Sequence, residues 1–269
     1  MWSRSTFVIT GVFALSVELQ AARTEIPAAP KMIIPTYIVD EGVEFKAIFD
    51  GKTLQGWDGD PLYWRVENGS IVGETTPQHL LKTNTFLIWR GGKPADFELK
   101  LEYRITTSGN SGIQYRSNEI SAPGAKWVMS GYQYDIDGAA WGKMFEKFLR
   151  PQGLYIPRVT GQIYDEEGRG FLALPGQFSY VIADKEPPRV IASLGDAESM
   201  ARLIKDGTWN AIDLIARSHQ LIQILNGRVI AMTVDEDPEH SRSDGLIGLQ
   251  LHVGDPMKVQ FRHIRLKIL

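Results

Sequence analysis

The sequence contains no cysteine, which excludes disulfide bonds, a thiol nucleophile and any zinc site built on cysteine. A chain without cysteine suits a reducing and an oxidising compartment equally well, so cysteine usage does not indicate a location. The formal net charge is −3 and no run of lysine or arginine forms a basic arm, so we expect no nucleic-acid partner. The 269 residues are 43% hydrophobic and 23% charged, which is typical of a globular chain with one large domain.

The apolar stretch near the N-terminus is too short to span a membrane. FVITGVFALSV at 7–17 falls below the roughly 20 residues that a transmembrane helix needs, so we expect no membrane span. The stretch follows Arg4 and precedes Ala21 and Ala22, which is the order of a secretory signal peptide. A buried helix is the alternative, but the proline-rich segment IPAAPKMIIP that follows disfavours it. We therefore predict a signal peptide over 1–22, a linker over 23–40 and a periplasmic or secreted protein.

Residues 41–269 break into many short alternating segments that are separated by glycine, asparagine, aspartate and proline. Strands of this length and spacing predict an all-β sandwich. Asn68-Gly69 and Asn226-Gly227 each lie between two such segments and predict hairpins with type I′ turns.

Helix signals are scarce in this region. One short helix is predicted over 196–205, with Asp196 as its N-cap. The connection over 139–160 is longer than a hairpin needs and contains several aromatic residues, so we expect an ordered, functional long loop there.

Three predicted strands carry an unusual polar side. Successive residues of a strand point to opposite faces, and in SGIQYRS, GYQYDID and LIGLQLHV one face is apolar. The other face carries amides and ionisable groups: Gln114 and Arg116, then Gln133, Asp135 and Asp137, then Gln250 and His252. For a single strand, a solvated sheet face is the simplest interpretation. Three such strands together favour a concave sheet that receives a hydrogen-bonding ligand such as a sugar.

Further candidates lie in loops near these strands. Trp127 and Trp141 flank GYQYDID and are suited to stacking on a sugar ring. GQIYDEEGRG supplies Asp165, Glu166 and Arg169, which we place at the rim of the same pocket.

We expect neither a metal nor a cofactor. No His-x-His, HExxH or calcium-loop pattern occurs, and no serine-hydrolase, P-loop or dinucleotide motif is present. A calcium ion at 235–237 or at Asp135 and Asp137 stays open, although a solvated acidic turn is the simpler interpretation of 235–237.

Several motifs occur together in a familiar order: FKAIFDGKTLQGW, DFELKLEYRI, GNSGIQYRS, GYQYDID, GQIYDEEGRG and GLIGLQLHVGDP. With them, residues 44–269 resemble the 3-keto-disaccharide hydrolase domain family, formerly a domain of unknown function. The resemblance implies a concanavalin A-like jelly-roll sandwich that cleaves glycosides whose C3 hydroxyl has been oxidised to a ketone. The ketone acidifies the C2 proton, so such a site needs a base for that proton, a stabiliser of the enolate and an acid for the leaving group.

The polar sheet side offers candidates for these roles. Asp135 is assigned as base or sugar ligand, Arg116 as enolate stabiliser or partner of Asp135, and His252 as acid or base. A structural ion pair between Arg116 and Asp135 is the alternative. Glu166 is the fourth catalytic candidate, and the predicted carbohydrate-binding residues are Gln114, Gln133, Gln250, Trp127, Trp141, Asp165 and Arg169.

The sequence departs from the family at two of these positions. Many members have glutamate where this chain has Gln133, and glutamine where it has Asp135. If that glutamate is the usual base, its role has either moved to Asp135 or been lost. A non-catalytic, lectin-like carbohydrate-binding module is therefore the main alternative, and a structural domain with a solvated polar side is the third. The aglycone, the anomer, the chain length of the substrate and the oligomeric state are not set by the sequence.

Overall fold

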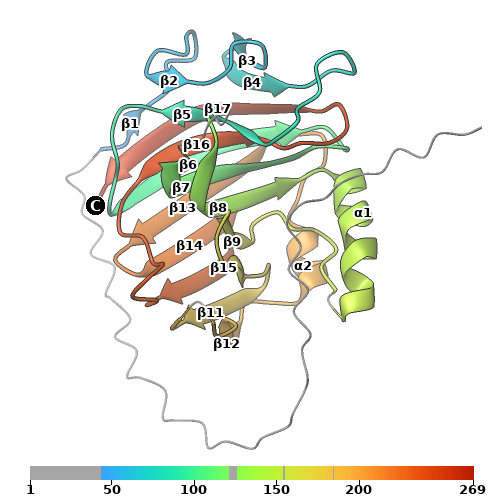
Figure 1. Cartoon of the computed structure of the whole chain (residues 1–269), viewed down its shortest axis with the longest axis vertical. Coiled ribbons are helices and arrows are strands. Elements are labelled where there is room, and N and C mark those ends of the chain that lie inside the picture. Colours follow the sequence, from blue (N-terminus) through green and yellow to red (C-terminus); the bar gives the residue numbers. More distant parts are fainter. Residues whose placement is uncertain (1–43, 121–125, 154, 184) are drawn as a thin grey trace, which may run out of the picture. The chain divides into compact units, whose positions relative to one another are not determined.

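The computed structural model describes residues 44–120, 126–153, 155–183 and 185–269. These residues form a ten-stranded and a seven-stranded sheet, with two helices beside them (Figure 1). The predicted all-β sandwich is confirmed. The predicted signal peptide and linker lie outside the described residues.

The ten-stranded sheet forms one layer. In sheet order its strands are β12 (Arg189–Ser193), β11 (Gln177–Val181), β15 (Arg228–Asp235), β14 (Gln220–Leu225), β13 (Asn210–Arg217), β6 (Phe97–Ile105), β17 (Lys258–Ile268), β4 (Ser70–Glu74) and β3 (Trp64–Glu67), with β1 (Lys46–Ala47) also paired to β17. All neighbours are antiparallel except β11 and β15, which are parallel.

The seven-stranded sheet forms the other layer, and all its neighbours are antiparallel. In sheet order its strands are β10 (Gly170–Ala173), β9 (Ile163–Glu166), β8 (Met129–Asp137), β7 (Asn110–Glu119), β16 (Leu246–Leu251), β5 (Thr85–Trp89) and β2 (Trp57–Asp58).

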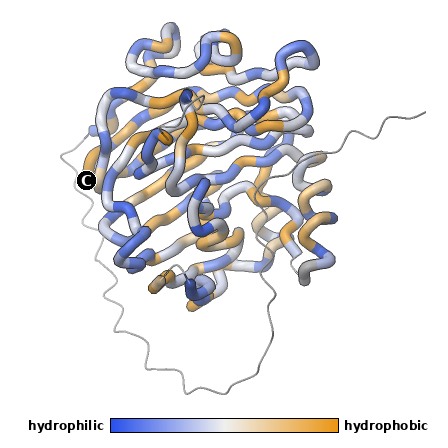
Figure 2. The backbone as a smooth tube through the Cα atoms, in the orientation of Figure 1, coloured by the Kyte–Doolittle hydropathy of each residue, from blue (hydrophilic) through white to orange (hydrophobic). Residues whose placement is uncertain are grey.

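The core lies between the two sheets and is built by alternation along the strands. In β6, Phe97, Leu99, Leu101 and Tyr103 are buried while the residues between them stay half-exposed. Figure 2 shows the same change between hydrophobic and hydrophilic residues along the strands. The core cluster joins residues of both sheets, among them Tyr132 and Tyr134 of β8. Burial of this apolar surface is the main force that holds the two layers together.

Both predicted Asn-Gly hairpins are confirmed. Asn68 and Gly69 join β3 to β4 with φ of 48° and 75°. Asn226 and Gly227 join β14 to β15 with φ of 50° and 83°. Positive φ at both central residues is what a type I′ turn requires, and asparagine and glycine adopt it with little strain.

The predicted N-cap is also confirmed. Helix α2 (Ala197–Ala201) is shorter than the predicted 196–205, and the Asp196 side chain accepts a hydrogen bond from the Ser199 backbone N–H at 2.7 Å. No helix in the described ranges has the length and apolarity needed to cross a membrane.

The prediction of a single helix and a long loop after β8 is wrong. Helix α1 (Ala139–Leu149) follows β8 directly and ends in the short 3₁₀ turn η1 (Arg150–Gln152). Its N-cap is Gly138, which provides no capping side chain, and its first turn contains no acidic residue. The helix instead buries apolar side chains, because Trp141, Phe145 and Leu149 pack in one cluster with the segment that follows.

Candidate functional site

The predicted polar side is a real and continuous feature of the seven-stranded sheet, and we call it the polar face. It carries Gln114 of β7, Gln133 and Asp135 of β8, Glu166 of β9 and Gln250 of β16, together with Gln162 just before β9. The neighbouring apolar residues of these strands belong to the core on the opposite side. The face is not solvated, because Asp135 is only 6% exposed and Gln114 and Gln250 are fully buried.

A directional chain of hydrogen bonds ends on Asp135. The Ser117 hydroxyl donates to Gln114 Oε1 at 2.5 Å, and Gln114 Nε2 donates to Gln133 Oε1 at 3.0 Å. Gln133 Nε2 then donates to Asp135 Oδ1 at 2.5 Å, while Gln162 Nε2 donates to Asp135 Oδ2. The two oxygens of Asp135 are therefore both held by amide N–H groups.

Gly112 makes room for this chain. It lies opposite Asp135 in the pairing of β7 with β8. A Cβ atom at Gly112 would stand 2.5 Å from Gln133 Cδ, far inside van der Waals contact. The absence of a side chain at this position lets the Gln133 amide lie over the backbone and reach Asp135.

Glu166 forms a second carboxyl centre on the polar face. Its Oε1 accepts hydrogen bonds from Asn84 Nδ2 at 2.9 Å and from Gln250 Nε2 at 3.1 Å. Asn84 is itself fixed, because its Oδ1 accepts from the Val253 N–H at 2.9 Å. Within the described ranges, Glu166 Oε2 has no hydrogen-bond partner, so one oxygen is positioned and the other is free.

Burial raises the pKa values of both carboxyl groups toward pH 7. It raises the pKa of Asp135 to about 8, against the opposing hydrogen bonds from Gln162 and Gln133. It raises the pKa of Glu166 to about 7, against the opposing hydrogen bond from Asn84. The negative charge of Glu166 also contributes to the rise at Asp135. Two such groups on one face can take up and release protons near pH 7, as acid–base catalysis requires.

His252 and Trp141 lie at the end of β16. His252 Nδ1 is 2.6 Å from the Val253 carbonyl oxygen, and because a carbonyl only accepts, the proton of the neutral ring is on Nδ1. Its Nε2 therefore carries a lone pair and no proton, and burial lowers the pKa of the ring. Trp141 of α1 meets this ring edge-on, with centroids 6.1 Å apart. Because Val253 also binds Asn84, the pair lies close to the Glu166 centre.

Arg116 does not pair with Asp135, and that expectation is wrong. A β-bulge is the reason: Tyr115 pairs with Tyr132 but Asn118 pairs with Ser130, so β7 contains one residue more than β8 at this point. Arg116 has a left-handed backbone conformation with φ of 45°. The extra residue interrupts the alternation of side chains along β7, so Arg116 does not share a face with Gln114 as predicted.

The Arg116 guanidinium instead satisfies groups on distant loops. It donates to the carbonyl oxygens of Ala95 at 2.8 Å, Ser218 at 2.6 Å and Arg242 at 3.2 Å, and to Asp96 Oδ1 at 2.9 Å. The side chain is 1% exposed. Arg116 therefore links several loops through hydrogen bonds and does not belong to the polar face.

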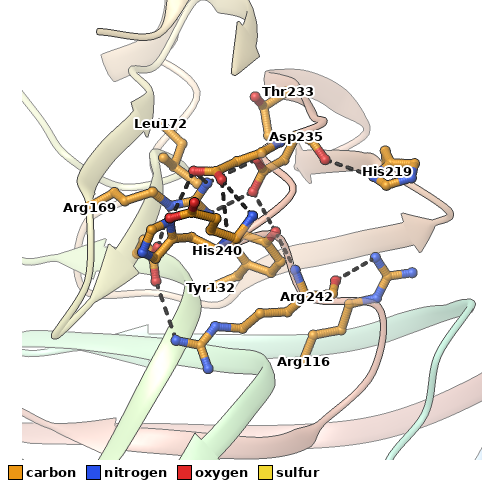
Figure 3. Close-up of polar contacts among 12 residues, drawn as sticks. Arg116, Tyr132, Arg169, Leu172, His219, Thr233, Asp235, His240 and Arg242 are labelled. Carbon is orange, nitrogen blue, oxygen red and sulfur yellow. Dashed lines mark hydrogen bonds and ion pairs between the residues drawn. The ribbon is translucent and has the colours of Figure 1, made fainter. Parts of the chain in front are cut away.

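Asp165 and Arg169 also lie away from the polar face, contrary to the expected rim position. Asp165 lies opposite Tyr132, whose ring is in the core, so it points to the inner side of β9. Arg169 forms ion pairs with Asp165 at 2.7 Å, Asp235 at 2.7 Å and Asp237 at 3.2 Å (Figure 3). The acidic segment 235–237 is therefore not a solvated turn, because Asp235 and Asp237 are buried around a guanidinium.

Trp127 packs on an apolar area of the seven-stranded sheet, beside the polar face. It packs on the cluster of Phe86, Ile88 and Met129, and Phe86 is the pairing neighbour of Gln250. Its Nε1 donates to Asp58 Oδ1 at 2.8 Å, and the Lys126 ammonium lies 3.8 Å from the ring centroid. One ring face is therefore already covered by a cation.

Three residues of the site were not among the sequence candidates: Asn84, Gln162 and Tyr164. Gln162 and Tyr164 precede Glu166 at intervals of two, so alternation along GQIYDEE was a usable signal for both. Tyr164 lies opposite Gln133 in the strand pairing, and burial followed by the charge of Glu166 raises the pKa of its hydroxyl. Asn84 has no comparable signal, because only the tertiary fold brings it to Glu166.

Solved structures define the class of this domain. A candidate glycosyl hydrolase of Parabacteroides distasonis superposes with a TM-score of 0.52 at 18% identity, covering 84% of this chain and 100% of the other. A Bacillus subtilis protein of unknown function with a galectin-like fold gives a TM-score of 0.50 at 10% identity, covering 80% and 90%. At such identities the likeness establishes the sandwich fold that these domains share.

The family follows from the sequence match. Residues 44–267 match the 3-keto-alpha-glucoside-1,2-lyase-like domain, and the chain belongs to this carbohydrate-active, glycosyl hydrolase-like family. A 3-keto-disaccharide hydrolase of Bacteroides thetaiotaomicron is 35% identical over 82 residues. That match spans 28% of this chain and only 28% of the length of the relative.

Proposed function

We propose that this domain cleaves the glycosidic bond of 3-keto-glycosides on the polar face by elimination. A base removes the C2 proton, the electron pair moves into the C3 carbonyl to give an enolate, and the C1–O bond then breaks as the leaving oxygen gains a proton. Water adds to C1 of the resulting enone, so that the net reaction is hydrolysis. The observation that carries the proposal is the pair of buried carboxyl groups, Asp135 and Glu166, whose pKa values are raised to about 8 and about 7 on one amide-lined face.

The hydrogen bonds support a division of roles between the two carboxyl groups. Glu166 Oε2 has no hydrogen-bond partner among the described residues, and its carboxyl pKa is raised to about 7, which suits the base for the C2 proton. Asp135, with its pKa of about 8, is mostly protonated at that pH and suits the proton donor to the leaving oxygen. This exchanges the roles expected from the sequence, in which Asp135 was the base. His252, whose Nε2 carries no proton, is the second candidate for the base.

Tyr164 takes the place of Arg116 as the group that stabilises the enolate. It lies beside Gln133, and its hydroxyl has no hydrogen-bond partner among the residues the structure describes. Burial raises its pKa, so the hydroxyl stays protonated and can donate to the C3 oxygen as negative charge develops there.

One contact supports a concave, enclosed face. Gln250 of β16 and Glu166 of β9 are three strands apart in the sheet, a separation of about 14 Å if the sheet were flat. Their side chains meet at 3.1 Å, so they extend toward each other across the polar face and narrow it. An enclosed face favours an enzyme over an open binding groove, because it excludes water from the charged intermediate.

The test is release of aglycone from a chromogenic 3-keto-glucoside, with the unoxidised glucoside measured in parallel. We expect turnover of the keto substrate alone, and a loss of at least about 100-fold in Glu166→Gln and in Asp135→Asn. Glu167→Gln is the matched control, because Glu167 is the exposed neighbour of Glu166 and should stay within about twofold of wild type. Saturable sugar binding without turnover would instead identify a lectin-like, non-catalytic module.

A further inference from the structure

Two amide oxygens on the polar face have no hydrogen-bond donor. They are Oε1 of Gln162 and Oε1 of Gln250, on residues 3% and 0% exposed, and neither has a partner within the described ranges. Native structures leave few buried polar atoms unpaired, because an unpaired acceptor loses its hydrogen bonds to water and regains nothing. Other unpaired atoms of the described residues, such as the Tyr103 and Tyr134 hydroxyls, lie in the core. These two amide oxygens instead lie beside the two carboxyl groups of the polar face, where a ligand can supply the donors.

The orientation of both amides is fixed by the carboxyl groups. Gln162 Nε2 donates to Asp135 Oδ2, and Gln250 Nε2 donates to Glu166 Oε1 at 3.1 Å. Turning either amide over would break the hydrogen bond that its N–H group donates to the carboxyl oxygen. Each amide therefore uses its nitrogen on a carboxyl group and directs its oxygen elsewhere.

The other two glutamines of the face differ in this respect. Gln114 accepts from Ser117 and donates to Gln133, and Gln133 donates in turn to Asp135. Both ends of each amide are thus satisfied within the chain. The polar face contains two kinds of glutamine, one that is saturated and one that has a free acceptor.

We propose that Gln162 and Gln250 are a pair of acceptors that bind two hydroxyl groups of one sugar, one beside Asp135 and the other beside Glu166. This rests on the proposed function for the identity of the ligand as a sugar. A ketone oxygen accepts hydrogen bonds but cannot donate one, so the oxidised C3 position satisfies neither amide. The site therefore selects glycosides with two free, unoxidised hydroxyl groups and excludes those in which either is alkylated or acylated.

The test uses ligands that lose one donor at a time. Binding of methyl glucoside to the full chain is compared by calorimetry with its monodeoxy and monofluoro analogues at C2, C4 and C6. Fluorine replaces the hydroxyl in size but cannot donate. We expect two positions at which both analogues bind about 10- to 100-fold more weakly than the parent, because each leaves a buried acceptor unpaired.

Variants then assign each position to one amide. In Gln162→Met the analogue penalty should vanish at one position, and in Gln250→Met at the other, as in a double-mutant cycle. Gln260→Met is the matched control and should retain both penalties, because Gln260 lies on β17 of the other sheet, where it accepts a hydrogen bond from Arg104. Fluoro analogues that bind the wild-type chain as tightly as the parent would overturn the inference without any variant, and so would penalties that persist in both methionine variants.

The outcomes separate this inference from the proposed catalysis. Turnover of the keto-glucoside with no fluoro penalty would leave the reaction standing and remove the acceptor pair. Penalties at two positions without any turnover would leave the acceptor pair standing and remove the reaction. An absence of saturable binding by every sugar in the series overturns the acceptor pair, whatever the turnover assay shows.

Discussion

Replacement of Arg169 by methionine removes the one guanidinium that contacts all three buried carboxylates of Asp165, Asp235 and Asp237 among the described residues. The Arg169 side chain is 4% exposed. Burial alone would lower the pKa of Arg169, but the hydrogen bonds to Asp235 and Asp165 outweigh it and raise the pKa. Methionine keeps much of the apolar packing and removes the charge, so we expect a loss of about 3–5 kcal/mol in the free energy of unfolding.

The loss of unfolding free energy should depend on pH, and the carboxylates determine in which direction it changes. Without the guanidinium, the pKa of Asp237 is no longer lowered by the charge of Arg169 and burial raises it, so protonation of Asp237 then favours the folded state. In the wild-type chain burial opposes ionisation of Asp237, but backbone N–H groups of Glu239 and His240 and the charge of Arg169 outweigh it and lower its pKa. That stabilisation persists until the pH falls through the lowered pKa. The deficit of Arg169→Met should therefore shrink as the pH falls from 7 to 5.

Urea unfolding followed by tryptophan fluorescence at pH 7 and pH 5 measures both effects. Arg189→Met is the matched control, because Arg189 forms a surface pair with Glu186, with side chains 55% and 51% exposed, and should lose less than about 1 kcal/mol. A loss below about 1 kcal/mol for Arg169→Met at pH 7, or an equal loss at both pH values, would refute the reasoning.

Three further predictions concern the site and the fold. The kcat/KM for a 3-keto-glucoside should peak between about pH 7 and 8, because Glu166 must be ionised and Asp135 protonated. Asp135→Asn should abolish the decrease of kcat/KM on the alkaline side. A profile that changes in one direction only would contradict these roles. Gly112→Ala should cost about 1–3 kcal/mol, because its Cβ would displace Gln133, and an unchanged melting temperature would count against the close contact. Asp196→Ala should cost about 1 kcal/mol in urea unfolding through the lost cap of α2, whereas Asp196→Asn should lose only a fraction of that; equal losses would contradict the capping role.

The strands and hairpins could be predicted because their signals are local. Alternation along β7 and β8 identifies which residues share a face, and Asn-Gly pairs supply the backbone geometry of a turn whatever surrounds them. The same local rule gathered Gln114, Gln133, Asp135 and Gln250 before any tertiary contact was known. The motif GQIYDEEGRG also led to Glu166, the second carboxyl centre.

The predictions that were wrong concern features that depend on tertiary contacts. Helix α1 lacks a capping side chain and an acidic first turn, so its stability comes from packing that a sequence does not display. Arg116 was misplaced because a bulge depends on the pairing of two strands and not on one strand alone. Asp165 and Arg169 lie inside and not at the rim, because their charges neutralise one another between the sheets, a contact that depends on the tertiary fold.

The buried guanidinium of Arg116 bears on how the chain folds in time. Its carbonyl partners Ala95, Ser218 and Arg242 are 21, 102 and 126 residues away along the sequence. Contacts between such distant segments carry a high loop-closure cost, so we expect them to form after the folding transition state. Loss of this side chain should then accelerate unfolding while leaving the folding rate nearly unchanged. Arg116 would thus govern how long the native state persists rather than how quickly it is reached.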